Sequence, residues 1–250
     1  MTTDFTPDQA EEQLGNQIDD PIPSHGHGTM PVVGIGASES ALPQLQMLLQ
    51  GVPQHSGMAF VVLRHDPPGT GTEAAAEWAG RVGESIPLRV VPVERSVRLE
   101  GNTVYIVPPA RGARALDGGL VLTDGEPEHG RMVIDLFLRS MADTHGSLAA
   151  AVVLSGPGAD GAIGIKRVKE RGGLTVAQDP DEAALDAMPR AAIGTGMIDW
   201  VLPAREMPQR LVSYFQLQPA LQLPREEGAQ LQEVTRGGRE EDAPLRDILT

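Results

Sequence analysis

Val32-Val33-Gly34-Ile35-Gly36-Ala37-Ser38-Glu39-Ser40 is the stretch in which a polar leader gives way to a folded domain. Its short run of β-branched and aliphatic residues predicts a buried strand. The two glycines favour a sharp turn and a close approach of the backbone to a neighbour. A helical pattern of leucines begins at Leu42. We therefore expect Ser38 at a strand-to-helix turn, where a serine can be a nucleophile or can cap the helix.

Apolar runs and amphipathic segments alternate beyond this stretch. Strands are expected at 32–35, 58–63, 88–92, 103–107, 120–123, 149–154, 174–177 and 198–202, and helices at 42–49, 72–83, 133–145, 162–171, 183–193 and 205–216. This alternation indicates an α/β domain with a mostly parallel sheet. The stretch 88–123 lacks a clear helical pattern, so we expect an antiparallel excursion there, at one edge of the sheet.

Composition divides the chain into three parts. Residues 1–30 are acidic and polar without apolar periodicity, which predicts a disordered leader. Residues 31–217 carry the α/β pattern and form the expected domain. Residues 218–250 read as a charged, Gly-containing linker, and an amphipathic segment from Leu245 indicates the start of a possible following domain.

The overall composition excludes several classes of function. The chain has no cysteine, so disulfides and thiol nucleophiles are ruled out. Its net charge of −14 argues against nucleic acid as a partner. No apolar run approaches the ~20 residues that span a bilayer, and the N-terminus lacks a secretory signal. We expect a cytoplasmic protein without membrane insertion. His25 and His27 lack a nearby third ligand, so no metal is expected.

Three reactive side chains follow three of the expected strands. Ser38, His65 and Asp160 each come at the carboxyl end of a strand, where open α/β sheets bind ligands. Singly, each has a simpler structural role, as a helix cap or a loop hydrogen bond. Together they have the chemistry of a nucleophile, a general base and an orienting carboxylate. This interpretation requires one ring nitrogen of His65 to lie within hydrogen-bond distance of Ser38 and the other to lie near Asp160.

Nucleotide binding is the weaker alternative for the same stretch. Gly34-Ile35-Gly36 after a strand opens a dinucleotide-binding fingerprint, but Glu39 occupies the third glycine position. A carboxylate there would repel a pyrophosphate at the helix N-terminus.

Five blocks of sequence, in order, resemble the catalytic domain of the CheB methylesterases. They are Val33-Gly34-Ile35-Gly36-Ala37-Ser38, Phe60-Val61-Val62-Leu63-Arg64-His65, Val104-Tyr105-Ile106-Val107-Pro108-Pro109, Val153-Leu154-Ser155-Gly156-Pro157-Gly158-Ala159-Asp160-Gly161 and Ala187-Met188-Pro189-Arg190. The resemblance is closest to fusion proteins in which this domain precedes a CheR-type methyltransferase, and it extends from about Val32 to Leu211.

The resemblance implies a doubly wound, three-layer, Rossmann-like fold with helices on both faces of the sheet. It implies a serine carboxylic-ester hydrolase that cleaves glutamyl methyl esters on methylated chemoreceptors, with glutamine deamidation as a side activity. Ser38 would be the nucleophile, His65 the base and Asp160 its orienting partner. No cofactor is implied.

The chain departs from the family pattern close to the expected nucleophile. Glu39-Ser40-Ala41 replaces Thr or Ala followed by two glycines, and Arg64 replaces a common glutamine. Pro157 replaces a residue whose N–H is thought to hold the oxyanion, and proline has no N–H. We place Glu39, Arg64, Pro157, Gly158 and Met188 in the substrate-binding and oxyanion neighbourhood. These departures leave a second interpretation, a catalytically weakened domain with a binding or regulatory role.

Overall fold

The computed structural model of the 250-residue chain describes residues 30–65, 75–108, 111–124 and 132–221. The expected acidic leader and nearly all of the expected linker with its following segment lie outside these residues, as do His25 and His27. The text below concerns the described residues.

The main sheet consists of seven strands, and every neighbouring pair in it is parallel. Its strands are β1 (Val32–Ala37), β2 (Ala59–Arg64), β3 (Arg89–Pro92), β5 (Thr103–Ile106), β8 (Ala149–Val153), β9 (Leu174–Gln178) and β10 (Trp200–Leu202), in the order β10-β9-β8-β1-β2-β5-β3. The predicted parallel α/β architecture is confirmed.

A second, smaller sheet is antiparallel. It consists of β4 (Val97–Arg98), β7 (Gly119–Asp124) and β6 (Arg111–Leu116), in the order β4-β7-β6. The antiparallel excursion expected over 88–123 is therefore only partly right, because β3 and β5 belong to the parallel sheet. The strand β6 was not predicted. Its inward positions carry Ala113 and Ala115, which lack the β-branched side chains that mark a strand.

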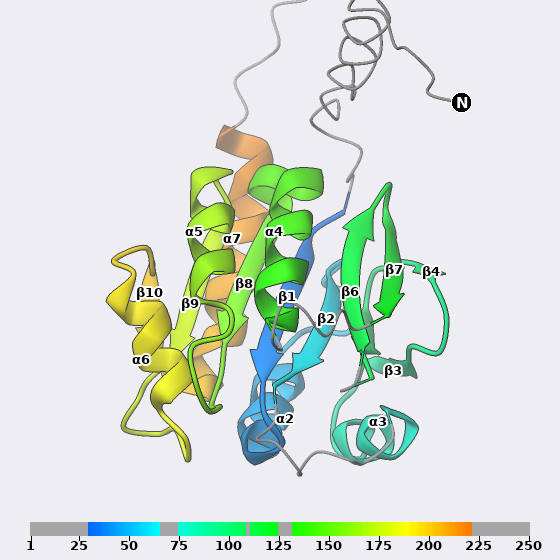
Figure 1. Ribbon diagram of the computed structural model, residues 1–250. Helices are drawn as coiled ribbons and strands as arrows, with labels where there is room; N and C mark the ends of the chain where they lie inside the picture. The colour runs from blue at the N-terminus through cyan, green and yellow to red at the C-terminus, as the bar shows by residue number, and fades with distance from the viewer. Residues whose placement is uncertain (1–29, 66–74, 109–110, 125–131, 222–250) are drawn as a thin grey trace, which may run out of the picture.

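Helices cover both faces of the main sheet (Figure 1). One face carries α4 (Val133–His145), α5 (Ala162–Glu170) and α6 (Ala187–Gly194), and the other carries α2 (Leu42–Gln50), α3 (Ala75–Gly83) and α7 (Met207–Leu221). Short 3₁₀ turns are η1 (Glu39–Ala41), η3 (Gly146–Leu148) and η4 (Ala204–Glu206). The helix expected at 183–193 begins only at Ala187.

Alternate residues of the central strands serve two separate cores. In β1, Val33 and Ile35 join the core with α2 and α7, while Val32 faces the core with α4. Because both faces of the sheet are covered, the strands can be apolar at successive positions. This explains the continuous apolar runs in the sequence.

Gly34 and Gly36 lie inside the straight strand β1 rather than at a turn. A Cβ at Gly34 would lie 2.7 Å from Cδ2 of Leu138, and one at Gly36 would lie 2.7 Å from Cγ2 of Ile134. The expected close approach is thus present, and the expected sharp turn is not. The glycines let α4 lie directly against β1.

Gly36→Ala should destabilise the protein by about 1–3 kcal/mol, because the added methyl group overpacks the contact with Ile134. Urea unfolding would measure the change in the free energy of unfolding. The matched control is Gly80→Ala in α3, where a Cβ meets nothing within 4 Å and a gain of about 0.5–1 kcal/mol is expected. Equal stability of the two variants would contradict the packing role of Gly36.

Candidate active site

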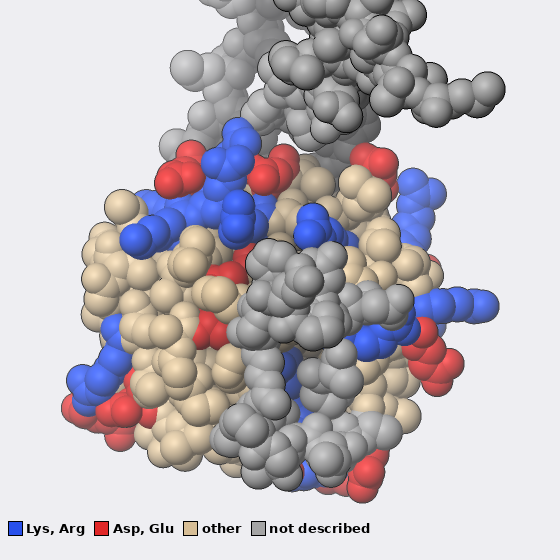
Figure 2. Space-filling view, in the orientation of Figure 1, with Lys and Arg blue, Asp and Glu red and all other residues tan. Residues whose placement is uncertain are grey.

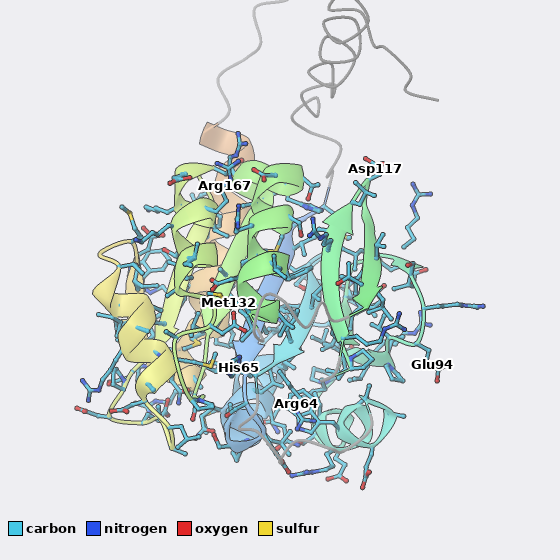
Figure 3. The ribbon with its side chains drawn as sticks, viewed as in Figure 1. Arg64, His65, Glu94, Asp117, Met132 and Arg167 are labelled. Carbon is cyan, nitrogen blue, oxygen red and sulfur yellow. The ribbon has the colours of Figure 1, made fainter. Side chains whose placement is uncertain are left out.

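The candidate site lies where the direction of winding changes in the main sheet. From β1 the chain proceeds to β2 on one side, and β8 lies on the other side of β1. Ligands of doubly wound sheets bind at such a switch point, beyond the carboxyl ends of the strands. Figure 3 shows His65 at this edge and Arg167 near the opposite edge.

Two main-chain hydrogen bonds extend the ladder past the strand ends into the site. The N–H of His65 donates to the carbonyl of Ala37 at 2.8 Å, and the N–H of Ser38 donates to the carbonyl of Ser155 at 3.0 Å. The segments that follow β1, β2 and β8 are thereby fixed to one another.

His65 and Asp160 form a direct contact. Nδ1 of His65 lies 3.0 Å from Oδ2 of Asp160, whose side chain is 1% exposed against 19% for the imidazole. A carboxylate only accepts hydrogen bonds, so Nδ1 carries the proton in this contact. In the neutral ring, Nε2 then keeps its lone pair and can act as a base.

Asp160 is also bound to the N-terminus of α4. Its Oδ2 accepts the N–H of Ile134 at 3.2 Å, and its Oδ1 accepts the N–H of Asp135 at 2.9 Å. The N-terminus of a helix carries partial positive charge and unsatisfied N–H groups, which favour an anion there. Asp160 therefore caps α4 from a distant part of the chain, rather than α5, whose N-cap is Gly161.

The Ser38 hydroxyl is buried and does not cap the following turn. It donates to the carbonyl of Ser155 at 2.9 Å, and its oxygen lies 2.7 Å from the hydroxyl oxygen of Ser40. Among the described residues these are its hydrogen bonds, and His65 is not one of its partners. The structure thus brings His65 and Asp160 into contact and turns the Ser38 hydroxyl toward a different group.

Glu39 lies between two guanidinium groups. Its carboxylate oxygens are 3.8 Å from Arg64 and 3.5 Å from Arg81. The Arg64 side chain is fully buried, and its guanidinium carbon lies 4.8 Å from the centroid of the Trp78 ring. The two arginines offset the negative charge that the sequence places beside Ser38.

The loop after β8 carries the other expected site residues. Gly158 has φ +76°, and a Cβ built there would lie 3.8 Å from Nε2 of His65. Pro157 precedes it and is half-buried. Met188 is buried, donates its N–H to the carbonyl of Gly156 at 3.0 Å and packs its sulfur against Gly156. Met188 therefore supports the loop through its contacts with Gly156.

Sequence reasoning missed the polar groups that hold these residues. Ser40 and Ser155 bond to Ser38, and Gln178 accepts the N–H of Ser155 through Oε1 at 2.8 Å. Asp135 contacts Asp160 through its main chain and is 3% exposed. The sequence did offer a signal for Gln178 and Asp135, because each is a polar residue among mainly apolar neighbours in its strand or helix. None was present for Ser40.

Charged residues at the C-terminal end of α5 and directly after it gather at the opposite end of the domain. Arg167 and Arg171 both bond Asp143, and Lys169 pairs with Asp199. Figure 2 shows basic side chains over the upper end of this face, far from the carboxyl ends of the strands. Within the described ranges, no group of three His, Cys, Asp or Glu residues is placed to hold a metal ion, and no helix is long and apolar enough to cross a bilayer.

The fold and this cluster define a class: a three-layer α/β domain with a serine, an imidazole and a carboxylate at the carboxyl edge of a parallel sheet. Residues 33–211 match the CheB methylesterase family, and the chain belongs to that family. The crystal structure of the Thermotoga maritima CheB methylesterase catalytic domain is similar with a TM-score of 0.66 and 29% identity, covering 74% of this chain and 98% of that one.

Two curated relatives show the extent of the match. A protein-glutamate methylesterase/protein-glutamine glutaminase of Carboxydothermus hydrogenoformans is 32% identical over 195 residues, covering 75% of this chain and 56% of the relative. An uncharacterised 104.1 kDa protein of Rhodobacter capsulatus is 40% identical over 132 residues, covering 53% of this chain and 14% of that protein. The matched part thus spans about half of the first relative and a small part of the second.

Burial raises the pKa of Asp135 from 3.8 to about 6; the N–H of Gly164 opposes this rise and the charge of Asp160 adds to it. A carboxyl group with a raised pKa in the folded state stabilises the fold below its unfolded pKa and loses that contribution as pH rises through 6. From about pH 4.5 to about pH 7.5, the loss amounts to about 2 kcal/mol.

Asp135→Asn should remove this pH dependence. The free energy of unfolding of the wild type, minus that of the variant, is expected to fall by about 2 kcal/mol over this range, because only the wild type must ionise a buried group. Urea unfolding at a series of pH values measures it. Asp117→Asn, at an exposed hairpin turn, is the control. A difference that stays constant with pH would contradict the assignment.

Proposed function

We propose that residues 31–217 form a protein-glutamate methylesterase domain that hydrolyses glutamyl methyl esters on methylated chemoreceptors. The observation that carries the proposal is the contact between His65 and Asp160, with Asp160 held by the N-terminus of α4 and Ser38 at the end of the adjacent strand. Membership of the CheB methylesterase family supports the same substrate class.

In this proposal the three side chains divide the work of acyl transfer. Ser38 attacks the ester carbonyl while Nε2 of His65 takes the hydroxyl proton. Asp160 holds the ring through Nδ1 and stabilises the imidazolium that forms. The tetrahedral intermediate expels methanol, which receives the proton from His65. Water, activated by the same imidazole, then releases the glutamate and restores Ser38. The steps need no redox group.

The resting geometry requires one movement before the reaction begins. The Ser38 hydroxyl donates to the Ser155 carbonyl, so it must turn about its Cα–Cβ bond to donate to His65. Catalytic hydrogen bonds are often incomplete in enzymes without substrate. The base and its orienting carboxylate are already in contact, whereas the nucleophile has still to turn.

Several finer features belong to the same proposal. The name of the Carboxydothermus relative includes a glutaminase, and the proposed chemistry extends to a glutamine amide, with ammonia as the leaving group. We place the domain in the cytoplasm, where it would reach receptor helices. A following CheR-type methyltransferase domain in a longer chain is also proposed. It is supported by the Rhodobacter protein, in which the matched domain is only 14% of a much longer chain.

A second candidate function is a weakened domain that binds or regulates without efficient turnover. Two observations favour it: the Ser38 hydroxyl is bonded away from His65, and Pro157 supplies no N–H to a developing oxyanion. Loss of one oxyanion donor costs about 10²–10³ in rate in a known serine protease.

Ser38→Ala should abolish demethylation, and Asp160→Asn should lower kcat by about 10²–10⁴ because the imidazole loses its orienting charge. Mass spectrometry of a methylated receptor incubated with each variant measures the loss of methyl groups. Ser147→Ala, before the start of β8 at the opposite edge, is the matched control and should retain wild-type activity. Demethylation by Ser38→Ala at the wild-type rate would exclude the esterase and leave the binding role.

A further inference from the structure

A chain of hydroxyl groups leads to Ser38. The main-chain N–H of Leu185 lies 2.8 Å from Oγ of Ser155, which lies 3.1 Å from Oγ of Ser40. Oγ of Ser40 lies 2.7 Å from Oγ of Ser38, which in turn lies 2.9 Å from the carbonyl oxygen of Ser155. Three serines from two loops are thereby joined.

Counting protons gives this chain a direction. A serine hydroxyl has one proton to donate, and a carbonyl oxygen can only accept. Ser38 donates to the Ser155 carbonyl, so its contact with Ser40 requires Ser40 to be the donor. Ser40 has then used its proton, so Ser155 must donate to Ser40, and the hydroxyl of Ser155 accepts from the N–H of Leu185. Every proton in the chain is used once.

The direction determines what Ser38 can do at rest. Its proton is given to a main-chain carbonyl, and one of its lone pairs accepts from Ser40. The proposed reaction needs that proton on Nε2 of His65 and a free lone pair on the oxygen. The donation to the Ser155 carbonyl must therefore break before Ser38 attacks, and turning the hydroxyl about the Cα–Cβ bond also takes its oxygen out of the contact with Ser40. The side chain is 1% exposed, so water competes poorly for them.

We propose that Ser40 is a positioning residue that holds the Ser38 hydroxyl in a resting orientation, turned away from His65. The inference rests on the proposed function of Ser38 as a nucleophile. Ser40 does not contact the reacting ester; it acts by donating a hydrogen bond to the resting oxygen of Ser38.

Removing the Ser40 hydroxyl should release Ser38 in part. The donation from Ser40 is lost, and the donation to the Ser155 carbonyl remains. One neutral hydrogen bond of the usual net strength corresponds to a change of about 2- to 10-fold in the population of the released orientation. The reactivity of Ser38 should rise by the same factor.

Reaction with diisopropyl fluorophosphate tests this without a receptor substrate. Ser38 forms a bond to phosphorus, fluoride leaves, and the hydroxyl proton passes to His65. We expect Ser40→Ala to be labelled at Ser38 about 2- to 10-fold faster than the wild type. The rate is read from the mass of the peptide that contains Ser38, and Ser38→Ala should show no label there.

Two further variants separate positioning from a general loss of structure. Ser40→Thr keeps the hydroxyl and should be labelled at about the wild-type rate. Ser140→Ala is the matched control, because that hydroxyl also makes two hydrogen bonds, with the N–H of Ala115 and the carbonyl of Phe137. It should lower the thermal midpoint without changing the labelling rate. A thermal scan of each variant accompanies the labelling.

The outcomes distinguish this inference from the proposed function. Equal or slower labelling of Ser40→Ala, including the absence of label in both proteins, overturns the holding role of Ser40 whatever the demethylation assay shows. Faster labelling of Ser40→Ala, together with labelling of Ser40→Thr at the wild-type rate, supports the holding role, even if neither the wild type nor the variants demethylate a receptor. In that case the methylesterase proposal fails and the resting orientation stands.

Discussion

The carboxylate of Asp160 joins the fold of this domain to its chemistry. It accepts two N–H groups at the start of α4, from Ile134 and Asp135, and it also contacts the imidazole of His65. A buried carboxylate is costly unless hydrogen bonds and positive charge surround it, and the helix N-terminus supplies both. The position of α4 therefore fixes where the imidazole can lie. The glycines of β1 matter for the same reason, because they allow α4 to lie against the central strand.

The site has two halves in different states. The half that we propose as the base is assembled: His65 is fixed by its main chain to β1 and by its ring to Asp160. The nucleophile half is not, because the Ser38 hydroxyl belongs to the chain of serine hydroxyls that ends at the Ser155 carbonyl. For the proposed methylesterase, this division predicts slow turnover or a nucleophile that substrate binding must turn toward His65. The hydrogen bonds of the serine chain constrain the Ser38 hydroxyl directly. The carboxylate of Glu39 does not, because it lies between Arg64 and Arg81.

Much of the fold could be predicted from the sequence, since apolar strands and amphipathic helices have distinct periods. The limits of α4 were predicted to the residue, because five apolar side chains mark one face of that helix. The antiparallel sheet was only partly predicted, as Ala113 and Ala115 carry no strand signal. The proximity of His65 and Asp160 was expected from their places after parallel strands. The capping of α4 by Asp160 was not, because it joins segments that only the folded chain brings together.

The orientation of Ser38 lay beyond sequence reasoning for a similar reason. A hydroxyl turns toward an acceptor within hydrogen-bond distance. For Ser38 that acceptor is the carbonyl of Ser155, whose own N–H is held by Gln178, and both residues come from other strands or the loops after them. Pattern and motif place the serine at the correct edge of the sheet, but they do not define which acceptor it meets.

The tautomer of His65 tests the account most directly. Nitrogen-15 NMR of the imidazole in the whole protein reports which ring nitrogen carries the proton when the ring is neutral. The contact with Asp160 predicts that Nδ1 carries the proton and that Nε2 is unprotonated, and Asp160→Ala should remove that preference. A neutral ring with its proton on Nε2 in the wild type would contradict the assignment of His65 as a base oriented by Asp160.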